Sequence, residues 1–148
     1  MSSENRIHLI GDFRREEAVA VAAISPGHLI EEDSAGEFQV HSTEGGYAMR
    51  LVAVEDALQG DTIDDAYAAD DLVSGNVELP GNEVQMYLAA GENVAIGDNL
   101  ISAGDGTLIA NGSEASGVTV RQLIAVAREA KDLSGSGAVD TLIRVMLY

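Results

Sequence analysis

The chain carries three histidines, His8, His28 and His41, and no cysteine. No two of these histidines have the short spacing that places two ligands on one face of a helix or strand, so the sequence does not predict a transition-metal site. No Gly-x-Ser-x-Gly nucleophile motif occurs. Adjacent carboxylates such as Glu31-Glu32 and Asp70-Asp71 are too common here for any one pair to stand out as a general acid and base. We therefore expect a protein that is not an enzyme and holds no cofactor.

Two groups of polar side chains have the oxygen donors that calcium prefers: Asp98, Asp105 and Asn111, and Asp61, Asp64 and Asp65. Neither group completes the twelve-residue calcium loop that ends in Glu, so turn residues on an acidic surface explain them better. The Gly-Asp-Gly sequence at 104–106 could cradle a phosphate, but neither a strand-to-helix pattern nor a Lys follows it. None of these groups is expected to be a metal or phosphate site.

The N-terminal segment is the one place where the sequence points to a partner. Three of the eight basic residues lie there among large apolar side chains, and together the candidate contacts are Arg6, Ile7, Leu9, Ile10, Phe13, Arg14 and Arg15. A basic and apolar arm on an acidic body can bind an acidic surface, because each Arg offers forked hydrogen bonds to carboxylates. The alternative is a disordered or self-packed first strand. On the first interpretation, a chain starting at Ala18 should stay folded and lose its affinity.

The charge of the whole chain is strongly negative. It has 25 Asp and Glu against 8 Lys and Arg, a formal net charge of −17, and Lys131 is its single lysine. Self-repulsion at this density weakens a compact state in dilute buffer, whereas in molar salt the Debye length falls to about 3 Å. We interpret the composition as adaptation to a salt-rich cytoplasm such as that of a haloarchaeon. An acidic mesophilic protein is the alternative.

The length and composition indicate one domain. A chain of 148 residues buries roughly 70% of the surface that its unfolded form exposes, which is enough for a core. Residues 1–17 are too charged for a secretory signal, and no apolar run approaches the roughly 18 residues of a membrane span. Nucleic acid is a poor partner for so acidic a chain. We expect an arm at 1–17 and one β domain at 18–148, with neither membrane nor nucleic acid as partner.

Short apolar runs separated by turn residues predict an all-β fold. The predicted strands are at 18–24, 29–30, 38–40 and 47–54, with a long acidic connection at 59–83 that holds one short strand near Thr62-Ile63. Val84, Met86 and Leu88 alternate with polar residues as in a half-buried strand. Residues 103–106, Ala-Gly-Asp-Gly, predict a hairpin turn between strands at 100–101 and 108–109.

A weak internal repeat is visible in the sequence. Residues 26–30 match 96–101, with Gly27 and Gly97 aligned, and 51–57 match 124–130. Two similar β halves would explain both matches, and chance similarity between Gly-rich β segments is the alternative. The second match favours a strand over a helix at 122–130. The last residues, 141–148, are apolar on both faces apart from Arg144 and predict a closing strand that is covered on both sides.

Several motifs, taken in their order, resemble the capsid decoration (cement) proteins of tailed viruses. They are Asp-Ala-Tyr-Ala-Ala-Asp-Asp at 65–71, Pro-Gly-Asn-Glu at 80–83, Met-Tyr-Leu-Ala-Ala-Gly at 86–91, Ile-Gly-Asp-Asn-Leu at 96–100 and Gly-Asp-Gly-Thr-Leu at 104–108. With 51–57 and the final strand, the resemblance covers most of residues 20–148. None of these motifs is catalytic, and no motif of the family is recognised in the N-terminal segment.

The resemblance implies a small β-barrel or sandwich, of the β-tulip or SH3-like kind, that forms a homotrimer on the outer face of an assembled icosahedral head. It also implies binding to the major capsid protein, an arm that locks neighbouring capsid subunits against internal DNA pressure, and presence in the host cytoplasm during assembly. Together with the acidic composition, it points to a haloarchaeal tailed virus. A cation- or ligand-binding β module of a halophilic host, using 59–83, is the alternative function, and a hydrolase with paired carboxylates ranks last.

Overall fold

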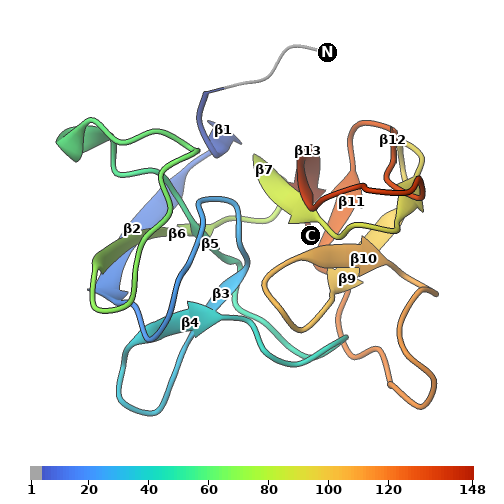
Figure 1. Ribbon diagram of the computed structural model, residues 1–148, viewed down its shortest axis with the longest axis horizontal. Helices are drawn as coiled ribbons and strands as arrows, with labels where there is room; N and C mark the ends of the chain where they lie inside the picture. The colour runs from blue at the N-terminus through green and yellow to red at the C-terminus, as the bar shows by residue number, and fades with distance from the viewer. Residues whose placement is uncertain (1–4) are drawn as a thin grey trace.

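The computed structural model describes residues 5–148, and these fold into two β units that lie side by side (Figure 1). The first unit is formed by β2 (Phe13–Val19), β3 (Ile30–Glu32), β4 (Phe38–Val40), β5 (Leu51–Ala53) and β6 (Leu72–Glu78). A single turn of 3-10 helix, η1 (Ala57–Gln59), lies between β5 and β6. Among the described residues, no helix is long and apolar enough to cross a bilayer.

The second unit is a closed barrel. It contains β7 (Glu83–Leu88), β8 (Asn93–Val94), β9 (Asn99–Ser102), β10 (Leu108–Ala110), β11 (Ala125–Ala127), β12 (Lys131–Asp132) and β13 (Thr141–Leu147). Strands pair in the order β7-β10-β9-β11-β13, and β13 pairs again with β7, which closes the barrel. β1 (His8–Ile10) adds to the free side of β7, and β8 pairs with β12. The expected all-β barrel or sandwich is confirmed.

The first unit repeats this ring of strands. β2, β6 and β5 form one sheet and β3 pairs with β4. Single bridges, Ala20 to Phe38 and Leu29 to Val52, connect the two pieces. Each strand therefore has a counterpart: β2, β3, β4, β5 and β6 correspond to β7, β9, β10, β11 and β13. The two halves that the sequence suggested are present in the structure.

Main-chain hydrogen bonds fix the alignment of the halves. The Gly27 N–H donates to the Ala53 carbonyl at 2.8 Å, and the Gly97 N–H donates to the Ala127 carbonyl at 2.9 Å. The β3–β4 and β9–β10 hairpins have the same register 70 residues apart. Gly27 thus aligns with Gly97 as predicted. Ala53 aligns with Ala127, whereas the sequence match of 51–57 with 124–130 had paired it with Val126.

Two apolar clusters correspond to the two units. Phe38, Ile30 and Val73 lie in the smaller cluster. The larger cluster fills the second barrel around Met86, Leu100 and Ile143, and it also takes in side chains from the first half, notably Leu29 and Val52. The two units therefore share buried apolar surface, which stabilises their contact by roughly 25 cal/mol for each Å² removed from water.

Several predicted strands are confirmed and others are wrong. The hairpin at 100–109, the strand within 122–130 and the closing strand at 141–148 are present. The seven-residue β6 was missed, because it lies inside the predicted acidic connection, and Thr62-Ile63 is a turn. The closing strand is central rather than sandwiched: it has β7 on one side and β11 on the other, and its burial alternates, with Ile143, Val145 and Leu147 buried.

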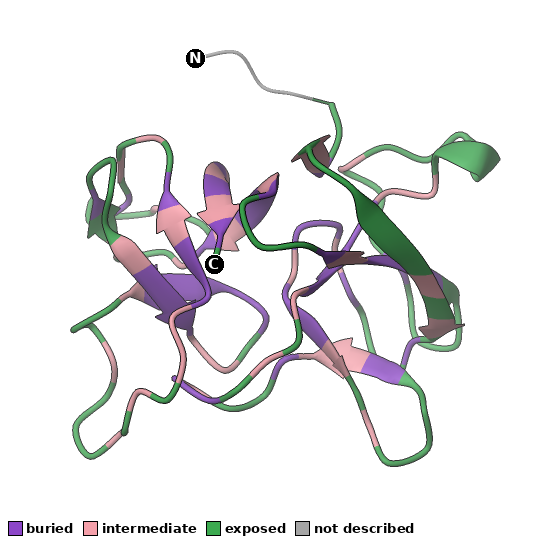
Figure 2. Cartoon of the chain, turned by 180° about the vertical axis from the view of Figure 1, so that it is seen from behind, coloured by how far each residue is buried: buried purple, intermediate pink, exposed green. Residues whose placement is uncertain are grey.

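The N-terminal residues are part of the body over most of their described length. β2 pairs with β6 at every position from Phe13 to Val19, so the predicted boundary at Ala18 falls inside a strand. Ile7 is fully buried in the larger cluster. Figure 2 shows β2 as a long exposed strand on the outside of the molecule. A chain starting at Ala18 would lose β1, most of β2 and a core side chain, and we therefore test this segment by substitution.

Candidate functional site

The segment from Arg6 to Arg15 contributes to three surface pockets of the described structure. It first runs along β7 of the second half as β1, then turns at Gly11-Asp12 and continues along β6 of the first half as β2. Because the segment crosses from one half to the other, the pockets lie where the two units meet β1 and β2. We refer to this region, lined by Arg6, His8, Leu9, Ile10, Phe13, Arg14 and Arg15, as the β1–β2 surface.

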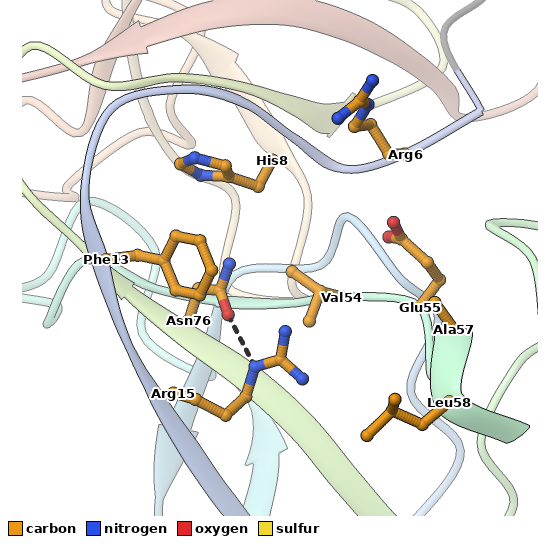
Figure 3. A pocket seen from close by; sticks show the side chains of 9 residues that line it. All are labelled: Arg6, His8, Phe13, Arg15, Val54, Glu55, Ala57, Leu58 and Asn76. Atoms are coloured by element: carbon orange, nitrogen blue, oxygen red, sulfur yellow. Dashed lines mark hydrogen bonds between the residues drawn. The ribbon is translucent and has the colours of Figure 1, made fainter.

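The largest of the three pockets has a volume of about 420 Å³ and combines basic with apolar side chains (Figure 3). Its lining comprises Arg6, His8, Phe13, Arg15, Val54, Glu55, Ala57, Leu58 and Asn76. Arg15 donates from Nε to Asn76 Oδ1 at 2.9 Å, and its guanidinium lies 5.8 Å from the centre of the Phe13 ring. Within residues 5–148, neither Arg6 nor Arg15 forms an ion pair. Both cations are thus available to an anionic group.

A buried carboxylate fixes one wall of this pocket. Glu78 on β6 is fully buried, and both of its oxygens lie 3.0 Å from Nδ1 of His8. The other ring nitrogen of His8, Nε2, lies 2.7 Å from the Gly11 carbonyl oxygen. These contacts of the His8 ring join β1 to β6 and orient the imidazole against Phe13, whose ring centre is 4.5 Å away.

The turn between β1 and β2 is held by the same carboxylate. Asn82 donates from Nδ2 to Glu78 Oε2 at 2.6 Å and to the Asp12 carbonyl at 2.6 Å. A Cβ on Gly11 would lie only 1.8 Å from Asn82 Oδ1, and Gly11 has a φ of 112°, so this position requires glycine. The crossing segment is therefore a fixed part of the structure between its two strands.

The other two pockets flank the first. One, of about 250 Å³, is lined by Arg6, Leu9, Ile10 and Arg144. The second, of about 370 Å³, is lined by Asp12, Phe13, Arg14, Val77 and Leu79. Large apolar side chains that line the pockets remain exposed: Ile10 is 52% exposed, Phe13 42% and Leu79 50%. Arg14 pairs with Glu16 at 2.8 Å on the surface, an exposed pair that contributes little to stability.

The structure brings six of the seven residues predicted from the sequence onto this surface. Ile7 is the exception, because its side chain is in the core and its N–H donates to Glu55 Oε2 at 3.1 Å. Sequence reasoning missed the partners of the segment, namely Glu55 and Leu58 near η1 and Asn76, Val77 and Leu79 on or after β6. The alternation of Val73, Gly75 and Val77 was the signal that could have identified β6.

The acidic groups that were considered as calcium ligands form turns. Asp98 accepts the Ala95 N–H at 2.9 Å, and Asp65 accepts the Thr62 N–H at 2.7 Å. Asp105 accepts both the N–H and the hydroxyl of Thr107, at 3.0 and 2.6 Å. These are the side-chain turns that Asp commonly makes. Within residues 5–148, no group of three or more His, Cys, Asp or Glu side chains is arranged to hold a metal ion.

The fold is similar to that of a solved structure, the head fiber gp8.5 N base in bacteriophage phi29. The TM-score is 0.58 with 15% sequence identity, and the similarity covers 93% of this chain and 95% of that chain. No family model matches the chain, and no curated protein is similar to it in sequence. At this identity the likeness shows a shared fold, and it extends over almost the full length of both chains.

Proposed function

We propose that this chain is a non-catalytic structural protein of a tailed-virus head, which binds the outer surface of the assembled head and stabilises it against internal DNA pressure. The observation that carries the proposal is the full-length similarity of its fold to a phage head fiber base. The partner is the major capsid protein. The protein acts as a homotrimer of β-tulip type, and it passes through the host cytoplasm during assembly.

The charge of the chain fits the outside of a head. A net charge of −17 repels packaged DNA, whereas the exterior of a shell keeps the protein away from it. The same composition supports a haloarchaeal virus, whose particles form in concentrated salt. No bond needs to be made or broken in this role, and each copy needs only a few kcal/mol because many copies act on one shell.

The β1–β2 surface is the proposed contact with the head. It presents the guanidiniums of Arg6 and Arg15, which form no ion pair within residues 5–148, together with exposed Ile10, Phe13 and Leu79. Arg and aromatic side chains next to pockets are typical of the residues that carry binding energy at interfaces. The partner surface would supply carboxylates to the two arginines, since Arg binds carboxylates through paired hydrogen bonds.

Binding to undecorated heads in molar KCl tests the proposal. The R6Q/R15Q double variant should bind at least about tenfold more weakly, a loss of about 1.4 kcal/mol. The control is R121Q/K131Q, which removes the same charge from residues outside the β1–β2 surface. If the wild type fails to bind heads at micromolar concentration, the proposed function is wrong. If both double variants lose affinity equally, the contact lies elsewhere.

A further inference from the structure

The outer edge of β7 is covered by other parts of the same chain. The Gln85 N–H donates to the Ile7 carbonyl at 2.8 Å, and the Tyr87 N–H donates to the Gly27 carbonyl at 3.2 Å. Gly27 lies in the turn before β3, which belongs to the first half. The contact between the halves therefore includes a turn of one half placed on the edge strand of the other.

This turn fits closely against the second half. Gly27 has a φ of 100°, and a Cβ on it would lie 2.4 Å from Leu142 Cδ2 and 3.4 Å from Tyr87 Cδ2. Leu142 is on β13 and Tyr87 is opposite it on β7. The docking site for the turn thus consists of the Tyr87 and Leu142 side chains and the outward N–H of Tyr87.

The first half has the same site without a covering turn. By the alignment of the halves, Val19 on β2 corresponds to Tyr87 and Leu72 on β6 corresponds to Leu142. Val19 and Leu72 are paired neighbours, and they are 38% and 57% exposed. In the described structure β2 has β6 as its strand partner on one side, and the other side meets only the bridge from Ala20 to Phe38.

The backbone of Val19 faces outward at this site. The Ala20 N–H donates to the Asp71 backbone carbonyl at 2.8 Å, toward the β6 side. The Val21 N–H donates to the Phe38 carbonyl at 2.9 Å, on the opposite side. N–H groups alternate in direction along a strand, so the Val19 N–H points the same way as that of Val21. Within residues 5–148 it has no backbone acceptor. An unpaired edge of this kind is a template for another chain.

The second half carries the matching turn, and it is free. Gly97 corresponds to Gly27 and has a φ of 95°, yet no atom of residues 5–148 lies within 4 Å of the position its Cβ would occupy. Ile96, next to it, is 67% exposed. The turn has the same backbone hydrogen bond as the turn at Gly27: the Asp98 N–H donates to the Ala95 carbonyl, and the His28 N–H donates to the Ser25 carbonyl.

We propose that the free turn at 95–98 of one copy docks on Val19 and Leu72 of a second copy, with the Gly97 carbonyl accepting the Val19 N–H. This contact between two chains has the same form as the contact that the Gly27 turn makes with Tyr87 and Leu142 within one chain. It joins different surfaces of the two copies, so it is head-to-tail and generates a ring when the rotation between copies closes. It specifies the self-contact of the homotrimer proposed above and in that respect rests on the proposed function.

Salt should control this association. Glu17 and Asp71 lie on or next to the two strands at the acceptor site, and Asp98 lies in the docking turn, so like charges approach one another. In molar KCl the screening length is about 3 Å, and the apolar contact between Ile96 and the Val19–Leu72 pair then dominates. Association is expected to strengthen between 0.1 and 2 M KCl.

Analytical ultracentrifugation of the full chain without heads, in 2 M KCl, tests the contact. L72N and I96N should each weaken self-association at least tenfold. M49N is the matched control: Met49 is 53% exposed and lies beside Arg50, whose carbonyl accepts the Glu78 N–H at the opposite end of β6. Thermal unfolding of each variant at low concentration checks that the fold is retained.

Mixing the two variants distinguishes a head-to-tail contact from a symmetric one. L72N keeps an intact turn and I96N keeps an intact acceptor site, so an equimolar mixture should form a two-chain complex that neither variant forms alone. A wild-type chain that stays monomeric at 0.5 mM, or L72N and I96N variants that associate as well as M49N, would overturn the inference. Because this assay contains no heads, neither result tests head binding, which the assay with R6Q/R15Q measures separately.

Discussion

The basic residues near the N-terminus show what residue types can and cannot predict. Arg6 and Arg15 are rare cations in an acidic chain, so the sequence alone marks them as candidate contacts. Ile7 has the same apolar character as Ile10, yet Ile7 is fully buried and Ile10 is 52% exposed. The register of β1 on β7 decides between the two, and that register depends on long-range pairing that the local sequence does not encode.

His28, whose ring is half-buried, links one side chain to the pH dependence of stability. Burial lowers its pKa from the usual 6.5, and the carboxylates of Asp105 and Asp140 oppose this shift. The neutral ring accepts the Ser25 N–H at Nδ1, at 3.1 Å, and a protonated Nδ1 could not. Because the pKa in the folded state lies below that in the unfolded state, the unfolded chain binds the proton more readily. Stability should therefore be full above pH 6.5 and fall as the pH drops from there toward the folded pKa.

The H28N variant keeps an acceptor for the Ser25 N–H and removes the titrating group. We expect its free energy of unfolding, measured with urea, to decrease less than that of the wild type when the pH is lowered from 7.5 to 5.5. The difference between the two proteins isolates His28 from the many carboxylates that titrate in both. Equal losses in the two proteins would show that His28 does not contribute to the pH dependence.

At the scale of elements, hairpins were predicted well and the long β6 was missed. The β9–β10 hairpin has a Gly-Asp-Gly turn between apolar pairs, which is a local signal. β6 contains Ser74, Gly75 and Asn76, residues of low strand propensity, and its pairing with β2 and β5 stabilises it. Tertiary pairing therefore overrode local propensity at the strand that contributes Asn76 to the pocket of about 420 Å³.

The turns at Gly27 and Gly97 have similar backbone geometry but different surroundings, so the same substitution should destabilise the fold to different extents. G27A and G97A both place a side chain at a φ near 100°, which costs about 1–3 kcal/mol. G27A should cost more, because its Cβ would also lie 2.4 Å from Leu142 Cδ2, whereas a Cβ on Gly97 would have no atom of the described residues within 4 Å. Urea unfolding at a concentration too low for self-association measures both free energies. If G97A is as destabilising as G27A, the turn at 95–98 is already packed in the isolated chain.

At the scale of the whole molecule, the β1–β2 surface exists because the chain crosses between two similar units. The second unit is a closed barrel and the first repeats its ring of strands, and the N-terminal segment contributes β1 to the second unit and β2 to the first. The weak sequence repeat suggested two halves, with chance similarity as the alternative, and the structure contains the two halves. The repeat could not show their contact, since that contact depends on Gly27 meeting Tyr87 and Leu142, which are far away in the sequence.

The charge of the whole molecule predicts how the fold responds to salt. With 25 acidic and 8 basic residues, most carboxylates have no cation nearby, and their repulsion acts over about 10 Å at 0.1 M salt but only about 3 Å at 1 M. The melting temperature should fall when KCl is lowered from 2 M to 0.05 M. The D61N/D64N variant changes two exposed carboxylates beyond η1 and should show a smaller fall, because it removes part of the repulsion. Sucrose, which strengthens apolar burial without screening charge, should not replace KCl in protecting the wild type. A melting temperature that is independent of KCl would contradict the proposed adaptation to a salt-rich host.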